Sequence, residues 1–139
     1  MNLSELEEQR RQLLSEISTI GDMHSGTLSI RYQRCSNRLC VCHAKGHKGH
    51  GPIYSFSMLV DGKTKIRNYK LGPELAKLQK ESENYQRFKK FTQELTLVNN
   101  AICEQRPVTR VSDNEDLEEL KKKLKKQLEK KYHEKLDKS

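Results

Sequence analysis

The chain has 139 residues, of which 33% are hydrophobic and 33% are charged, and it contains no tryptophan. This length leaves little room for an enzyme with a separate substrate domain, and so polar a composition does not build one thick core. The formal net charge of +8 is concentrated, because residues 24–72 carry nine Lys or Arg against a single acid. Such a basic segment favours a polyanionic partner.

The first segment, residues 1–23, has apolar residues at heptad spacing, which predicts an amphipathic helix over roughly residues 4–20. Ser4 is the expected N-cap and Gly21 the expected stop. The beginning of the chain is acidic and polar, unlike a signal peptide, and no stretch approaches the ~20 apolar residues that span a bilayer. We therefore expect a cytoplasmic protein.

Three cysteines and three histidines follow one another closely in the pattern Cys-x4-Cys-x-Cys-His-x3-His-x2-His. In a reducing compartment clustered cysteines are typical metal ligands, and zinc takes four soft or borderline donors in a tetrahedron. Free thiols or a redox pair are the alternative. We predict a Zn²⁺ site with the ligands Cys35, Cys40, Cys42 and His50. His47 remains an alternative fourth ligand, and His43 is geometrically awkward beside Cys42.

The predicted zinc is structural, because the segment holds no carboxylate except Asp61, which a turn already uses. No nucleophile–base pair or phosphate-cradling glycine loop stands out either, so we do not expect an enzyme. The fourth cysteine, Cys103, stands apart and is expected to be a small residue of a helix seam.

From Gly51 the hydrophobic pattern alternates with period two, which predicts a β-hairpin around Asp61-Gly62. A two-residue loop would pair Val60 with Lys63 and set the residues 54, 56 and 58 opposite the basic side chains. A three-residue loop, with Gly62 in a left-handed bulge position, would leave the basic side chains together on the other face. We favour the three-residue loop.

A long helix is predicted over residues 73–105, with Pro73 at its first position, followed by a linker at 106–114 and a charged helix at 115–139. The last helix carries a narrow apolar stripe, formed by Leu117, Leu120, Leu124, Leu128, Tyr132 and Leu136. The expected fold class is α+β: mainly helical, with a zinc-stabilised β-hairpin module at 24–72 flanked by these helices.

The middle of the chain resembles a family of small prokaryotic proteins known as a domain of unknown function, often encoded beside transposases of mobile elements. The resemblance covers roughly residues 26–103. It rests on the motifs GTLSIRYQRC with Cys40 and Cys42, His50-Gly51-Pro52 with Tyr54, Asp61-Gly62-Lys63-Thr64, and Asn84-Tyr85-x-x-Phe88. The chain departs from it in the histidine-rich loop and at Lys70-Leu71-Gly72-Pro73. The resemblance implies a mobile-element context and no specific activity.

These features predict a zinc-stabilised nucleic-acid-binding accessory protein, with DNA favoured over RNA. The side chains expected to contact phosphates are Arg31, Arg34, Arg38, Lys45, Lys48, Lys63, Lys65 and Arg67. The alternative is a coiled-coil scaffold that recruits a transposase or another protein, or that forms a homodimer.

Overall fold

A computed structural model describes residues 1–137 and contains three helices and a three-stranded sheet. The helices are α1 (Leu3–Ser18), α2 (Pro73–Gln105) and α3 (Asn114–Asp137), and the strands are β1 (Thr27–Gln33), β2 (His50–Val60) and β3 (Lys63–Tyr69). The predicted α+β class is confirmed. The chain divides into two compact units, the first ending at Gln105 and the second, which contains α3, beginning at Arg106.

Helix α1 begins earlier than the sequence suggested. Asn2, not Ser4, is the N-cap, and its side-chain oxygen accepts a hydrogen bond from the Glu5 backbone N–H at 2.8 Å. The prediction of Ser4 was wrong because Leu3 already has helical geometry. At the other end Thr19 is the C-cap, so the helix stops before Gly21.

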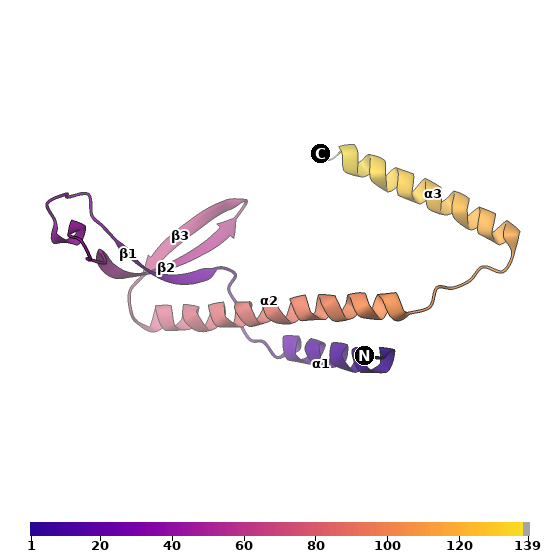
Figure 1. Ribbon diagram of the computed structural model, residues 1–139, viewed down its shortest axis with the longest axis horizontal. Coiled ribbons are helices and arrows are strands. Elements are labelled where there is room, and N and C mark those ends of the chain that lie inside the picture. The colour runs from indigo at the N-terminus through magenta and orange to yellow at the C-terminus, as the bar shows by residue number, and fades with distance from the viewer. Residues whose placement is uncertain (138–139) are drawn as a thin grey trace. The chain divides into compact units, whose positions relative to one another are not determined.

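Helix α1 packs against the C-terminal half of α2, as Figure 1 shows. Their core is a small cluster of buried side chains, formed by Leu6, Leu13, Val98 and Ile102. The connection from α1 to β1 is tied to the middle of α2, because Asn84 donates from its side chain to the Asp22 carbonyl at 2.8 Å. The sheet lies over the N-terminal half of α2, on the side opposite to α1 (Figure 1). One half of this long helix therefore lies beside the sheet and the other half beside α1.

The sheet is antiparallel, with the strand order β1-β2-β3 and β2 at its centre. The sequence predicted the β2–β3 hairpin but not β1. The signal for β1 was present, because Leu28, Ile30 and Tyr32 alternate with polar residues in the TLSIRYQ stretch. This third strand gives β2 a partner on each side.

The hairpin loop has two residues, because Val60 pairs with Lys63. Asp61 and Gly62 both have positive φ, +50° and +77°, as a tight turn that matches the strand twist requires. The favoured three-residue loop was therefore wrong. Asp is one of the few side chains that tolerates this backbone region, and Asp-Gly is a preferred pair in two-residue hairpin loops.

The shorter loop changes which face carries the basic residues of β3. Met58 is opposite Lys65 and Phe56 is opposite Arg67, so the basic side chains share the sheet face of Phe56 instead of lying on the other face. Arg67 lies 5.0 Å from the centre of the Tyr69 ring and pairs with Glu74 of α2 at 3.4 Å. The lysines of β3 remain exposed.

Within residues 1–137, no helix combines the length and the apolar character that crossing a membrane would need.

Candidate metal centre

The clustered cysteines and histidines, apart from His50, lie in the connection between β1 and β2, residues 34–49, which we call the knuckle. Cys35 follows the end of β1, Cys40 and Cys42 lie around the short 3₁₀ turn Val41–His43, and His50 is the first residue of β2. The structure brings these four side chains together. Their ligand atoms all lie within 4.8 Å of one another.

Two of the distances between donor atoms in the cluster match those of a tetrahedral metal site. The Sγ atoms of Cys35 and Cys42 are 3.5 Å apart, and Cys40 Sγ lies 3.4 Å from His50 Nε2. Four ligands at zinc-like bond lengths of about 2.0–2.3 Å stand roughly 3.4–3.8 Å from one another around a tetrahedron. The four residues are therefore close enough to bind one metal ion.

His50 is the histidine in the cluster, and the other two candidates have different partners. His43 donates from Nε2 to the Cys35 carbonyl at 2.7 Å, and His47 Nδ1 accepts from the Gly49 backbone N–H at 2.9 Å. Both contacts hold the knuckle together. His43 and His47 thus have positioning roles beside the four clustered side chains.

Asn37, which the sequence argument did not single out, shapes the turn between Cys35 and Cys40. Its side-chain oxygen accepts from the Leu39 N–H at 3.1 Å, and its backbone carbonyl accepts from the Cys40 N–H at 3.1 Å. Asn favours such local side-chain turns, which was the available signal. The turn brings the chain back so that Cys40 can face the cluster.

Two glycines on either side of His50 allow β2 to begin close to β1. Gly49 and Gly51 have φ of +99° and +148°, in the region that disfavours other residues. A Cβ at Gly49 would lie 3.0 Å from the Gln33 backbone, and one at Gly51 would lie 2.9 Å from the Arg31 carbonyl oxygen. The β1–β2 register shifts at this point and sets His50 opposite Gln33.

The cysteine thiols of the cluster differ in acidity. Hydrogen bonding from the Cys42 backbone N–H is the main cause that lowers the pKa of the Cys40 thiol to about 6, and the Cys42 and Cys35 thiols act in the same direction. Burial raises the pKa of the fully buried Cys42 thiol. Hydrogen bonding therefore favours negative charge at Cys40, whereas burial disfavours it at Cys42.

The predicted phosphate-contacting residues are all exposed, but they do not form one continuous row. Arg31 lies on β1 and donates from Nε to the buried Ser55 hydroxyl at 3.1 Å, on the sheet face opposite to Phe56. Arg34 donates to the His47 carbonyl at 3.4 Å. The remaining residues fall into a knuckle group, Arg38, Lys45 and Lys48, and a β3 group, Lys63, Lys65 and Arg67.

A family model described as a domain of unknown function, DUF6788, matches residues 3–80. The chain belongs to this family. The match includes α1 and the whole metal cluster and ends within α2, whereas the resemblance read from the sequence motifs was placed at 26–103. Neither the curated proteins nor the solved structures contain a significant match to the chain.

The fourth ligand can be tested with paired histidine variants. His50→Ala should weaken metal binding strongly because it removes a donor from the cluster, whereas His47→Ala should leave the four donors in place. Titration of each purified variant with Co²⁺, followed by its visible absorption, measures the difference. Equal loss of cobalt binding in both variants would contradict the assignment of His50.

Proposed function

We propose that this protein is a zinc-stabilised nucleic-acid-binding accessory protein that favours DNA over RNA. The donor chemistry supports zinc, because three thiols and one imidazole form a common structural zinc set. All four donors come from the protein, as in closed structural sites; Cys42 is fully buried, Cys35 and Cys40 are half-buried, and His50 is exposed. The proposal places the protein in the cytoplasm, where thiols stay reduced, and assigns it no catalytic step.

The observation that carries the nucleic-acid proposal is the absence of acidic residues around the metal cluster. Residues 24–60 contain no Asp or Glu and five Lys or Arg, and all five are exposed. Three cysteine thiolates and a Zn²⁺ ion would together contribute only −1. A polyanion therefore meets almost unopposed positive charge along the knuckle and the strands beside it.

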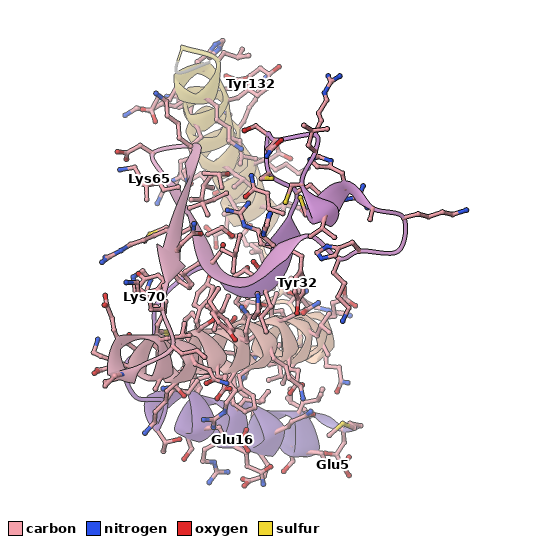
Figure 2. The ribbon with its side chains drawn as sticks, turned by 90° about the vertical axis from the view of Figure 1, so that its left-hand side faces the viewer. Glu5, Glu16, Tyr32, Lys65, Lys70 and Tyr132 are labelled. Carbon is pink, nitrogen blue, oxygen red and sulfur yellow. The ribbon has the colours of Figure 1, made fainter. Side chains whose placement is uncertain are left out.

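The charge distribution in the first unit also indicates which side of the unit would face a polyanion. Helix α1 carries four acids and two arginines, and it lies on the side of α2 away from the sheet. Figure 2 shows the labelled Glu5 and Glu16 on that side, with Lys65 and Lys70 on the sheet side. The sheet side is therefore the side that would face a polyanion.

A mobile-element setting, which the resemblance in the sequence implies, is compatible with this proposal. Basic side chains that contact phosphates bind with little sequence choice, so the proposal requires no recognition site in the DNA. We therefore include association with a transposase in the proposal, as the setting in which the protein would act.

The zinc part of the proposal is tested by Cys40→Ser. Structural zinc contributes about 10–16 kcal/mol of apparent binding energy to folding, so this variant should lose stoichiometric zinc and the sheet should melt. Elemental analysis of the purified protein and circular dichroism measure the two effects. The matched control is Cys103→Ser, which replaces an exposed cysteine of α2 and should keep zinc. Full zinc retention by Cys40→Ser would remove this site from the proposal.

The nucleic-acid part is tested by the salt dependence of binding to duplex DNA. Lys45→Glu combined with Lys48→Glu should weaken binding and lower the slope of log affinity against log salt by about 2, because each phosphate contact contributes about 0.9. Lys80→Glu combined with Lys90→Glu makes the same charge change on α2 and is the control. Wild-type affinity that is weak at low salt and does not change as salt rises would reject the proposal. The same titrations with duplex RNA and with single strands measure the preference for DNA over RNA.

A scaffold function is the second candidate, favoured by the half-exposed apolar stripe of α3. Leu120, Leu124, Leu128 and Tyr132 of this helix are 47–63% exposed. Such a stripe suits packing against another helix, from a protein partner or a second copy.

Light scattering of the full-length chain tests the scaffold function. A dimer should persist in Lys65→Glu combined with Arg67→Glu and dissociate in Leu124→Lys combined with Leu128→Lys. A monomeric wild type that captures no transposase in pull-down experiments would contradict this second candidate.

A further inference from the structure

Two exposed aliphatic side chains, Leu39 and Val41, lie next to Cys40 in the knuckle, and we call this pair the apolar tip. Leu39 is 95% exposed and Val41 is 68% exposed, and they stand on either side of Cys40. Neither contributes to the core of the first unit. An aliphatic residue this exposed is common when it stands alone, but here it sits on a backbone that several contacts hold in place.

The backbone around Leu39 is fixed on both sides. The Leu39 N–H is held by the Asn37 side chain, and the next N–H, of Cys40, is held by the Asn37 carbonyl. Cys40 itself is in the metal cluster, and its Sγ lies 3.4 Å from Nε2 of His50 on β2. A metal bound there would tie the tip to the sheet. Leu39 is thus presented outward by a small rigid turn and cannot easily fold back onto the protein.

The surroundings of Leu39 are basic and contain no carboxylate in residues 24–60. Arg38 precedes it directly, and the rest of the knuckle adds Arg34, Lys45 and Lys48, all of them exposed. Exposed apolar side chains in a basic segment match a ligand with phosphates outside and stacked, largely apolar bases inside. Duplex DNA has this arrangement.

The apolar tip is small, which suits the insertion of a single side chain. A stable protein interface buries about 800 Å² on each partner, far more than one leucine and one valine supply. A single aliphatic side chain, by contrast, is enough to enter a base step from the minor groove and kink the duplex.

We propose that Leu39 is a wedge that inserts between adjacent base pairs of duplex DNA from the minor groove, with the basic residues of the knuckle holding the flanking phosphates. The proposal rests on the nucleic-acid-binding function above and adds the mode of contact. Unstacking the base step costs free energy that burial of the leucine offsets. Removing the wedge therefore abolishes the unstacking, while phosphate contacts still hold the protein on the DNA.

The test uses the full-length zinc-loaded protein and a DNA duplex in which 2-aminopurine replaces adenine, because this base fluoresces more strongly when it is unstacked. The wild type should raise the fluorescence on binding. Leu39→Ala should lose this rise while it keeps its zinc content and the salt slope of binding. Leu39→Phe, which keeps a large apolar tip, should retain the rise. The control is Leu97→Ala, at a leucine of α2 that is 64% exposed, and it should behave like the wild type.

The outcomes separate the wedge from the function on which it rests. Wild-type protein that binds duplex DNA without any fluorescence rise, or a rise that Leu39→Ala preserves, would overturn the wedge and leave the nucleic-acid function standing. Wild-type protein that binds no nucleic acid would overturn the proposed function first. Loss of a protein partner in Leu39→Ala with unchanged DNA fluorescence would assign the tip to protein docking and also reject the wedge.

Discussion

The close backbone approach between the start of β2 and the end of β1 is the constraint on which the rest of the structure depends. Gly49 and Gly51 permit it, because a side chain at either position would collide with the β1 backbone. Their approach sets His50 opposite Gln33, at the point where the register of the two strands shifts. This register carries the imidazole to the three cysteines. The metal cluster therefore joins the knuckle to the sheet through a strand pairing.

The cluster matters so much because the first unit has little other material to hold its knuckle. Its hydrophobic cluster of buried residues lies between α1 and α2, away from the knuckle. Between residues 34 and 49, Cys42 is the one buried side chain, and apart from Gly49 the other residues are half-buried or exposed. A segment with so few buried apolar groups gains little from the hydrophobic effect. Metal binding is the interaction that would supply the missing stability.

The sequence predicted the features whose causes are local and missed those that depend on strand pairing. The four clustered residues and the α+β class were predicted, because the donors are close in sequence and the long helices repeat their apolar residues regularly. His50 was preferred over His47 and His43 without a decisive argument, because that choice depends on the β1–β2 register. The two-residue hairpin loop was weighed and wrongly set aside for a three-residue loop, because the argument placed the glycine alone at positive φ, whereas Asp61 adopts it as well. Strand β1 was missed although its alternation was visible.

The positions of the basic residues along the sheet set the length that a polyanionic ligand needs to contact all of them. Lys63 pairs with Val60 at one end of β2, and the knuckle adjoins His50 at the other end. At roughly 3.3 Å per residue, the eleven residues of β2 extend over about 33 Å. One turn of duplex DNA is also about 34 Å long. A short anion could therefore contact the β3 lysines or the knuckle, but not both at once. If the two basic groups act together, they require a nucleic acid of about one helical turn, which links the strand length to the proposed ligand.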